Sequence, residues 1–531
     1  YAYTGNSIET FYNGSWSPTN AQSGTWSTCY SGISNCNLFL DKYVGLTFPE
    51  LEQNADYKPQ MFRYNNYQYE VRFLRAYFYF NLVRQYGDVP FTDHFLSADE
   101  SNTLSRTPAK DIFDYIISEC DDIKDLIIED YANLPADVVL PSESPETGRV
   151  NKATVLALKA RAALYAASPL FNTDNNPELW HRAATANKEL LDYCVNERGM
   201  KLVSDYASLW DKNNYKNATD ELIFGRRANR ESSTMESYNY PVGIEGGNGG
   251  NCPTQNLVDA YETTDGCPVR LVDGVWTADG SRVFDKAKPY DNRDPRLTQI
   301  VLDPRHSKEI LYNKDKFIFP RVAGMTGWES ATGYHVIKYY IAEQDMKGYG
   351  NETHDAPLLR YAEVLLNLAE AKAELGTITQ SDLDRTVNVI RDRAGMPHLT
   401  LNPVMDPKYA AEGLSSLIIE IRRERRVELC FEDTRYQDLM RWKWGKRLAN
   451  RVLGMRFEPS DFDNPRFNPS EGKADPERVK LFELNGKHYI DVFAGTDWEN
   501  RSFDENKHYY HPIPVNVIGK NKEITQNPGW D

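Results

Sequence analysis

The chain has 531 residues, and its 77 Asp and Glu residues outnumber its 61 Lys and Arg residues to give a formal net charge of -16. This acidic balance would repel a phosphate backbone and no basic block interrupts it, so nucleic acid is not an expected partner. No apolar run approaches the ~18 residues that a membrane helix needs, so we expect a soluble chain. The sequence opens YAYTGNSIET without an initiator Met, so we expect a processed or truncated product whose targeting signal lies outside it.

Two groups of predicted helices are separated by a loop-rich middle. In the first group, residues 69–86 carry apolar and aromatic side chains almost all round, which is typical of a helix packed on several sides. Gly87 is placed to end this helix, and Thr107 can cap the next one with Pro108 at its first position. Small residues in the third helix predict close helix contact: Ala157, Ala160, Ala163 and Ala167. The four helices of this group are predicted at about 69–86, 108–128, 151–168 and 180–195.

The second group of helices is predicted at 355–376, 380–394, 411–431 and 436–448. Asp355 is the expected N-cap of the first of them. That helix shows a packed face and a polar stripe opposite to it, made by Leu358, Ala362, Leu365, Ala369 and Ala373 and by Glu363, Asn367, Glu370 and Glu374 respectively. Eight helices in consecutive pairs suggest stacked helical hairpins, although their spacing is too uneven to prove a repeat.

The chain between and after these groups lacks helical periodicity. Its middle is rich in Gly, Asn, Pro and isolated aromatics, so we expect loops with a few short strands. Long ordered loops on a rigid scaffold are where binding residues often lie. The predicted fold is therefore predominantly α-helical and forms a single unit over 1–531. It comprises N-terminal helical pairs at 60–200, a loop-rich candidate ligand-binding region at 201–350, C-terminal helical pairs at 355–450 and an irregular extension at 451–531.

No specific catalytic, nucleotide or metal motif is present. The glycine run at 243–250 lacks the flanking strand and helix of a phosphate cradle, and neither HExxH nor GxSxG occurs. The seven cysteines show no zinc spacing. Cys29 with Cys36, or Cys252 with Cys267, could close short loops in an oxidising compartment, and the odd count leaves at least one thiol unpaired. We expect no metal and no cofactor.

One stretch has enough oxygen ligands for a structural calcium loop. It is NTDNNPE at residues 172–178. Stretches of this composition more often form turns, so calcium is an alternative rather than the expectation.

The stretch IEIRRERRVELCFEDTRYQDLMRW at 419–442 alternates acids with arginines at helical ion-pair offsets. It could be a substrate-binding arginine cluster, or it could supply acid/base catalysis through Glu428 or Glu432. We favour a third interpretation, a partly buried network that ties the last helices together, because acids and arginines nearly balance and leave little net charge for a ligand. The predicted network consists of Glu424, Arg425, Glu428, Glu432, Arg435, Asp438 and Arg441.

Six motifs, in this order, resemble the SusD/RagB family of outer-membrane nutrient-binding lipoproteins of Bacteroidetes. The resemblance covers nearly the whole chain, and no single motif carries it. The motifs are EVRFLRAYFYFNLVRQYGDVPF (70–91), ATVLALKARAALYAA (153–167), NRDPRL (292–297), LLRYAEVLLNLAEAKAEL (358–375), RRERRVELCFEDTRYQDLMRW (422–442) and the terminal PIPVNVI with QNPGW (512–518 and 526–530).

The resemblance implies four tetratricopeptide-like helix pairs that cradle a variable region, and no catalysis. It also implies a lipid anchor on the cell surface of the outer membrane and a SusC-like TonB-dependent transporter as partner. Cys29, the first cysteine, follows no apolar segment and is not expected to be the lipidated residue. Asp433 stands where the family usually has a glycine after FE, and aspartate tolerates a left-handed turn, so we expect the helix junction to be kept.

Binding residues vary within the family and are chosen here on physical grounds. Aromatic residues make up 12% of the chain, and sugar rings stack their C–H faces on aromatic rings while polar groups bind their hydroxyls. The candidates are Trp276, Tyr290, Trp328, Tyr238 and Tyr240 in the middle loops, with Tyr64 and Tyr67 as a further wall. At each position an aromatic that only packs the loop is at least as common.

The expected function is binding of a glycan, an oligosaccharide or polysaccharide, at the cell surface and its delivery to a SusC-like TonB-dependent transporter. A peptide-binding RagB-like member of the same family is the closest alternative, and it should show charged or backbone-pairing groups in its pocket. A secreted glycoside hydrolase is the alternative from the enzyme class. It would need two acids roughly 5 to 9.5 Å apart across the cleft.

Overall fold

The computed structural model describes most of the chain, including nearly all of both helical groups. The described residues are 2–3, 16–19, 24–140, 146, 148–210, 218–226, 250–272, 275–278, 282–283, 290–302, 310–312, 316–318, 330–338, 356–463, 476–477, 479–496 and 498–531.

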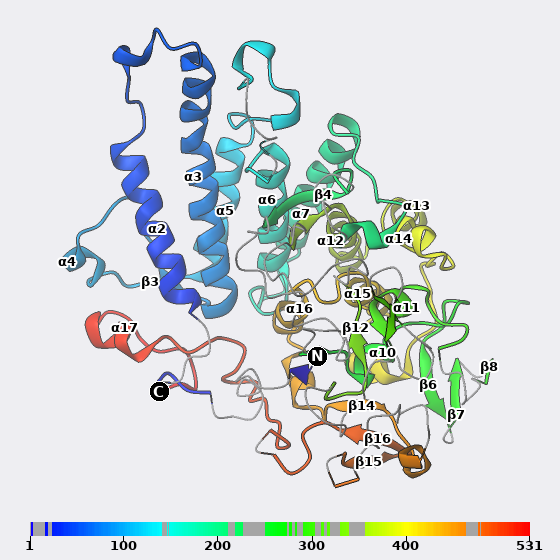
Figure 1. The fold of residues 1–531 in the computed structure, drawn as a ribbon. Coiled ribbons are helices and arrows are strands. Elements are labelled where there is room, and N and C mark those ends of the chain that lie inside the picture. The colour runs from blue at the N-terminus through cyan, green and yellow to red at the C-terminus, as the bar shows by residue number, and fades with distance from the viewer. Residues whose placement is uncertain are drawn as a thin grey trace.

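The main body is a row of helices in which each packs against the next, and Figure 1 shows the row running across the molecule. In the N-terminal part of the row the chain runs up one helix and down the next, so neighbouring helices there are antiparallel. In order of contact the helices are α2 (Thr25–Lys42), α3 (Tyr57–Tyr86), α5 (Ala109–Ile123), α6 (Lys152–Ala167), α7 (Pro177–Asp192), α12 (Tyr361–Glu374) and α15 (Ser416–Glu428). The prediction of a predominantly α-helical fold is confirmed.

Shorter helices connect and flank the row. The short α-helices are α4 (Ala98–Ser101), α10 (Gln255–Val258), α11 (Arg296–Ile300), α13 (Gln380–Arg385), α14 (Val387–Ala394), α16 (Arg435–Arg441) and α17 (Val515–Lys520). The 3-10 turns are η2 (Pro49–Leu51), η3 (Tyr131–Asn133), η4 (Ala136–Val138), η6 (Tyr206–Leu209), η7 (Pro407–Glu412), η8 (Gly445–Ala449) and η9 (Pro459–Asp463), and η5 (Tyr193–Glu197) is a π turn.

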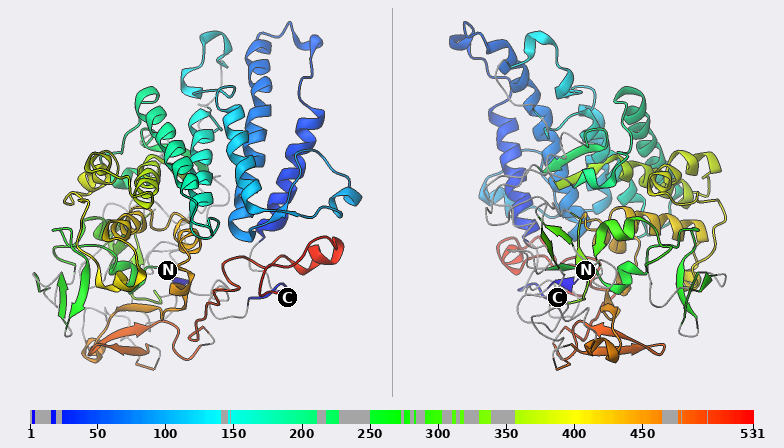
Figure 2. Two further views of the ribbon diagram at one scale, coloured as in Figure 1. Left: turned by 180° about the vertical axis from the view of Figure 1, so that it is seen from behind. Right: turned by 45° about the vertical axis from the view of Figure 1, so that its right-hand side comes forward.

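The described strands are short and pair antiparallel in small sheets. The two-stranded pairs are β1 (Ala2–Tyr3) with β5 (Asn251–Cys252), β2 (Val89–Pro90) with β3 (Arg106–Thr107), β4 (Leu222–Arg226) with β13 (Ala356–Arg360), β9 (Val301–Leu302) with β12 (His335–Val336), and β10 (Ile310–Tyr312) with β11 (Lys316–Ile318). The three-stranded sheets have the orders β6 (Val269–Val272), β7 (Val275–Ala278), β8 (Arg282–Val283) and β14 (Leu453–Arg456), β16 (Lys487–Asp491), β15 (Leu481–Leu484). Figure 2 shows the second of these sheets at the end of the molecule away from the α2–α3 connection.

The main core lies between the helices of the row. In α6 every residue except Lys152 and Arg161 is buried, because α5 and α7 cover it from two sides. The predicted small-residue strip, Ala157, Ala160, Ala163 and Ala167, belongs to this core, where side chains of one carbon let neighbouring helices approach closely.

Several predicted helix boundaries differ from the structure, for example α15 at Ser416–Glu428 rather than 411–431 and α16 at Arg435–Arg441 rather than 436–448. The helix α3 begins at Tyr57 rather than at residue 69, since its polar first turns are held by tertiary bonds: Arg63 binds Glu146 and the backbone of Val138. Residues 356–360 pair with β4 as a strand, so α12 begins at Tyr361 without a side-chain cap, and the predicted N-cap Asp355 lies outside the described residues.

The start of α5 is also capped differently. Its N-cap is Pro108, and the backbone N–H of Ala109 donates to the carboxylate of Asp88 at 2.8 Å, not to Thr107. The predicted helix 380–394 divides at Thr386 into α13 and α14.

The helix α2 was not predicted, because its mixed polar sequence shows weak periodicity.

The C-terminal segment closes back onto the N-terminal helices. Asn527 donates to the backbone oxygens of Tyr86 and His511 at 2.9 and 2.8 Å, and Arg106 donates to the backbone oxygen of Thr525 at 3.1 Å. The chain is thereby tied together across more than 400 residues, as the position of α17 beside the lower end of α2 shows in Figure 1.

All seven cysteines are free thiols, so neither Cys29 with Cys36 nor Cys252 with Cys267 forms a bridge. Cys29 and Cys36 lie on the buried face of α2, where burial raises the pKa of both thiols to about 11.

Candidate functional site

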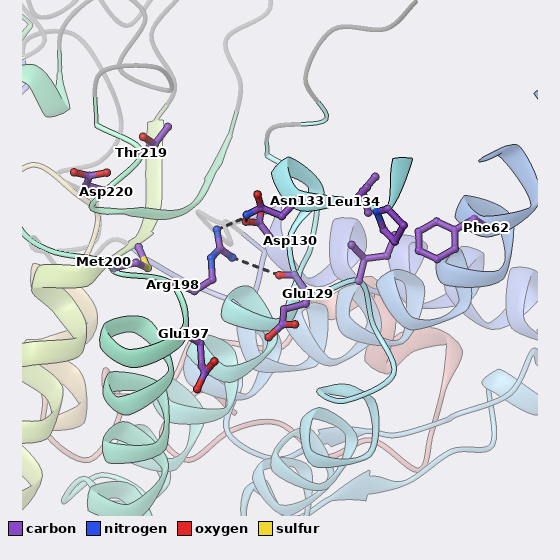
Figure 3. Close-up of a pocket in the computed structure, with 12 residues that line it drawn as sticks. Phe62, Glu129, Asp130, Asn133, Leu134, Glu197, Arg198, Met200, Thr219 and Asp220 are labelled. Carbon is purple, nitrogen blue, oxygen red and sulfur yellow. Dashed lines mark hydrogen bonds and ion pairs between the residues drawn. The ribbon is translucent and has the colours of Figure 1, made fainter. Parts of the chain in front are cut away.

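A cavity of about 530 Å³ opens at the end of the helical row where α3 begins and where α5 and α7 end. It collects side chains from the first turns of α3, the segment after α5, the end of α7 and the segment before β4. The lining residues, shown in Figure 3, are Phe62, Ile128, Glu129, Asp130, Asn133, Leu134, Pro135, Glu197, Arg198, Met200, Thr219 and Asp220.

A π turn at the end of α7 supplies Glu197 and Arg198 to this cavity. The turn spans Tyr193–Glu197, and the chain then reverses at Gly199, whose φ of 59° favours glycine. A π turn inserts an extra residue into a helix and recurs at functional sites. The local widening of α7 therefore positions Arg198, the only guanidinium among the described residues that line the large cavity.

The facing wall is organised by Asp130. Its carboxylate caps η3 by accepting from the backbone N–H of Ala132 at 3.0 Å and accepts from the side-chain amide of Asn133 at 2.7 Å. Arg198 approaches the same carboxylate at 3.4 Å and the backbone oxygen of Glu129 at 3.4 Å, as Figure 3 shows. Both contacts are long, so N–H groups of the Arg198 guanidinium can still donate to a ligand.

The chemistry of the cavity is that of a hydroxyl-binding site. Four carboxylates, those of Glu129, Asp130, Glu197 and Asp220, offer acceptors. Asn133 and Arg198 offer donors, while Phe62, Leu134, Pro135 and Met200 offer apolar contact. A ligand rich in hydroxyls that also carries C–H faces meets all three kinds of surface. An anionic ligand would be repelled by the surplus of carboxylates.

A smaller cavity of about 210 Å³ continues the first and shares Asp130, Arg198 and Thr219 with it. Its wall includes Tyr131 and Arg149. The Arg149 guanidinium lies 4.9 Å from the ring centroid of Tyr131 and 5.1 Å from that of Tyr67. Arg149 also pairs with Glu70, to which the Tyr131 hydroxyl donates at 2.8 Å. These bonds fix the Tyr67–Arg149–Tyr131 stack.

Two of the predicted aromatics, Tyr64 and Tyr67, lie in the first turns of α3. Tyr67 belongs to the stack just described and is half-buried. Tyr64 is half-buried as well, but its hydroxyl donates to the backbone oxygen of Tyr43 and accepts from the N–H of Leu46 at 3.0 Å. Tyr64 thus holds the α2–α3 connection in place.

The predicted aromatics of the middle region lie elsewhere. Tyr290 is only 8% exposed, and its ring lies edge-on to Tyr334 at 6.3 Å. The choice of Tyr290 as a surface for a sugar ring is therefore wrong, because the ring fills a core cluster. Trp276 lies in β7, opposite Leu271 of β6. Tyr238, Tyr240 and Trp328 lie outside the described residues.

The charge-rich stretch at 419–442 forms a buried ionic network. Glu428 is fully buried and accepts from Arg360, Arg393 and Arg296, the first at 2.7 Å. Burial raises its pKa, but the charges of Arg393, Arg360 and Arg296 outweigh burial and hold the pKa well below its usual range. A carboxylate so saturated with donors does not act as an acid or base near neutral pH.

Most of the remaining predicted members pair in the same way. Glu424 pairs with Arg296 and Arg391, and Glu432 pairs with Lys338 and Arg360. A second group joins Arg425, Asp438, Arg441 and Glu370. The polar stripe of α12 is therefore buried: Glu363, Asn367 and Glu370 face arginines of neighbouring helices.

Arg435 departs from this pattern. Asp438, its expected partner, already gives one oxygen to Arg425 at 2.8 Å and the other to Arg441 at 2.9 Å. No carboxylate of the described residues forms an ion pair with Arg435, whose guanidinium lies 6.0 Å from the ring centroid of Trp442. Its predicted place in the network is wrong.

The stretch at 172–178 forms the turn before α7. The Asn172 amide donates to the backbone oxygens of Ala167 and Asn176, and the Asn176 side chain caps α7 through the N–H of Glu178. Within the described ranges no three His, Cys, Asp or Glu side chains converge as a metal site. A calcium ion bound to this turn stays a prediction.

Comparison with known proteins assigns the family. The family model described as SusD family matches residues 208–530, more than half of the chain. The chain belongs to the SusD family. A second family model, described as starch-binding associating with outer membrane, matches residues 3–161, and it places this SusD family protein at the outer membrane. No helix in the described ranges has both the length and the apolar character to cross a bilayer.

Named relatives are about a quarter identical to this SusD family protein over the residues that align. SusD-like protein P2 of Formosa agariphila is 26% identical over 415 residues, which cover 75% of this chain and 68% of that protein. The starch-binding protein SusD of Bacteroides thetaiotaomicron is 24% identical over 468 residues, which cover 82% and 75%. A solved SusD-like carbohydrate binding protein from Bacteroides fragilis has a TM-score of 0.74 at 22% identity and covers 99% and 90%, which shows the shared fold.

Sequence reasoning missed the cavity residues Asp130, Asn133, Glu197 and Arg198. They come from segments about 65 residues apart whose meeting depends on how α5 and α7 end side by side. The sequence offered one weak signal. In ERG at 197–199, an acid and an arginine directly precede a glycine that can end the helix.

Proposed function

We propose that this protein captures an oligosaccharide or polysaccharide at the cell surface and passes it to a SusC-like TonB-dependent transporter. The observation that carries the proposal is the cavity in which Arg198, Asp130 and Asn133 form one hydrogen-bonding set beside Phe62. The names of the relatives, a starch-binding protein and a SusD-like carbohydrate binding protein, support a glycan as ligand.

The proposed binding mode uses both cavities. Hydroxyls of one sugar unit bind Arg198, Asp130 and Asn133 in the larger cavity, and the next unit lies against the Tyr131–Arg149 wall of the smaller one. The protein acts without catalysis and is held at the outer membrane by a lipid anchor that lies outside the described residues. Family membership supports each of these points.

The test is isothermal titration of the purified protein against plant, host and microbial polysaccharides, with reducing-sugar release followed in parallel. We expect binding without release, and about 10-fold weaker binding for Arg198→Ala and Asn133→Ala, since each removes hydrogen bonds to the ligand. Lys188→Ala, an exposed change on the outer side of α7, is the control and should bind as the unaltered chain does.

Other outcomes would change the proposal. Sugar release would favour a glycoside hydrolase. If no glycan of the panel bound and peptides did, a RagB-like function would be favoured. The four cavity carboxylates would then select basic peptides.

A further inference from the structure

Arginines gather around Tyr409 on a surface made by η7, α15, α16 and η8, apart from both cavities. We call Tyr409, Arg426, Arg435 and Arg447 the Tyr409 cluster. All four side chains are partly exposed, and none of them lines either cavity. The cluster is therefore a separate feature that the proposed glycan cavity does not use.

One guanidinium of the Tyr409 cluster is held rigidly. The rings of Tyr409 and Trp444 stack at 5.6 Å with an interplanar angle of 17°. The Arg447 guanidinium lies 4.5 Å from the first ring centroid and 4.6 Å from the second, and it pairs with Glu412. Stacking of a guanidinium on aromatic rings fixes its position and leaves donors at its edge.

The two other guanidiniums have no carboxylate partner in the part of the chain that the structure describes. Arg426 donates to the backbone oxygen of Asn256 at 2.8 Å, and the Arg435 guanidinium lies 6.0 Å from the ring centroid of Trp442. By contrast Arg423 and Arg425, on the same helix as Arg426, pair with Glu420 and Asp438 at 2.8 Å. Acids are plentiful in a chain of net charge -16, so the lack of an ion pair at Arg426 and Arg435 within the described ranges is a local property.

The surrounding charges make this surface positive. Burial raises the pKa of Tyr409, but the charges of Arg426, Arg423, Arg435 and Arg447 bring it below its ordinary value. Burial, followed by the charge of Arg426, lowers the pKa of Arg435 to about 9, so Arg435 stays charged at neutral pH. Two nearby acids are already paired: Glu412 with Arg447, and Asp438 with Arg425 and Arg441. A third is Asp259, whose pKa burial raises.

We propose that the Tyr409 cluster binds a single oxyanion, a sulfate ester or a carboxylate, carried by an acidic glycan, with Arg426 and Arg435 donating to its oxygens. The planar guanidinium fork matches both groups and supplies two parallel hydrogen bonds to each. The carboxylates of the large cavity repel such a group, so an acidic substituent needs a separate position. The choice of a glycan as carrier rests on the proposed function, but the oxyanion site itself does not.

The experiment first uses sulfate alone. Sodium sulfate is titrated calorimetrically into the protein at constant ionic strength, which separates site binding from general salt effects. We expect saturable binding in the unaltered chain and at least 10-fold weaker binding in the double variant Arg426→Gln/Arg435→Gln. The double variant Lys443→Gln/Lys446→Gln removes the same charge from exposed positions nearby and should bind sulfate normally.

A second readout reports on Tyr409 directly. A bound anion raises the pKa of a neighbouring phenol, so sulfate should shift the tyrosinate absorbance titration upward, and the shift should be absent in Tyr409→Phe. Should the double variant fail to fold, Arg435→Lys keeps the charge but loses the fork and should still weaken sulfate binding. Equal sulfate binding by all variants would overturn the site.

The glycan part is tested with sulfated and uronate-containing polysaccharides against a neutral one. Weaker binding of the acidic glycans alone in Arg426→Gln/Arg435→Gln supports the proposal, whereas Arg198→Ala should weaken the neutral glycan. Sulfate binding without binding of any acidic glycan would overturn the glycan as carrier and leave the neutral-glycan function untouched. Binding of the neutral glycan by Arg198→Ala is measured in a separate titration. Either proposal can therefore fail while the other stands.

Discussion

Arg441 and Glu370 form a two-point ion pair in the interior, although 71 residues separate them in the chain. Their atoms meet at 2.5 and 2.7 Å, and both side chains are 1% exposed. Trp442 donates to the same carboxylate at 2.6 Å. Burial raises the pKa of Glu370, but Arg441 outweighs burial and brings it down to about 2. This pair joins α12 to α16.

The first prediction follows from that burial. Glu370→Gln leaves Asp438, which Arg425 shares, as the only carboxylate paired with Arg441. We expect a loss of about 3–5 kcal/mol in the free energy of unfolding, because the buried Arg441 then shares its one remaining carboxylate with a second buried arginine. Urea denaturation measures this. Asp192→Asn breaks the exposed Lys188–Asp192 pair and should change stability by less than about 0.5 kcal/mol. Equal effects of the two variants would contradict the account.

The second prediction concerns pH and His511. This side chain is buried against Trp16 and Tyr86, and burial, followed by the charge of Arg84, lowers its pKa to about 3. Because the folded state resists protonation, the contribution of His511 is present above pH ~6.5, its unfolded pKa, and is lost as pH falls towards 3. Between pH 7 and 5 the loss should be about 2 kcal/mol.

The measurement for His511 is urea unfolding at several pH values in the unaltered chain and in His511→Gln. The variant is expected to lose part of the acid-side slope whatever its stability at pH 7. An unchanged slope would show that other groups produce the acid sensitivity.

The third prediction tests the junction between α15 and α16. Asp433 has a φ of 58°, which confirms the left-handed turn expected from the resemblance. Glycine adopts this conformation without the Cβ clash, whereas alanine bears the clash and lacks the local hydrogen bonding of aspartate. We expect Asp433→Ala to be less stable than Asp433→Gly by about 1 kcal/mol, measured by thermal unfolding. The reverse order would refute the strain argument.

The fourth prediction separates the ring of Tyr131 from its hydroxyl. If the ring forms a wall for a sugar, Tyr131→Ala should weaken glycan binding by roughly 2- to 10-fold, in line with ~0.5–1.5 kcal/mol for an aromatic contact. Tyr131→Phe keeps the ring and loses only the hydroxyl, which donates to Glu70 and accepts from Asn66, so it should bind nearly as the unaltered chain does. Calorimetric titration with the best glycan of the panel decides the matter.

Sequence periodicity predicted the helical pairs because it reports a local property, the side of a helix that meets its neighbours. It failed where a distant partner decides the structure. The polar residue Asn66 lies inside α3 because it binds the backbone N–H of Ile128, 62 residues away. Likewise residues 356–360 read as the start of a helix, yet their backbone pairs with β4.

The charge pattern at 419–442 indicated a structural network because acids and arginines nearly balance. It could not show that both oxygens of Asp438 bind other arginines, Arg425 and Arg441, so that Asp438 forms no ion pair with Arg435. The choice of aromatic candidates was also only partly successful. Tyr67 lies beside the smaller cavity, but Tyr290 is a core residue, and composition alone does not distinguish the two.

The ionic network also reaches the segments outside the helical row. Arg296 lies just before β9 and Lys338 just after β12, and both bind the charge-rich stretch, while β9 and β12 pair with each other. Both ends of the segment between 302 and 335 are thus fixed to the scaffold by charges that do not depend on what lies between them. Replacement of that segment by its counterpart from a homologous protein should therefore leave the helical scaffold folded.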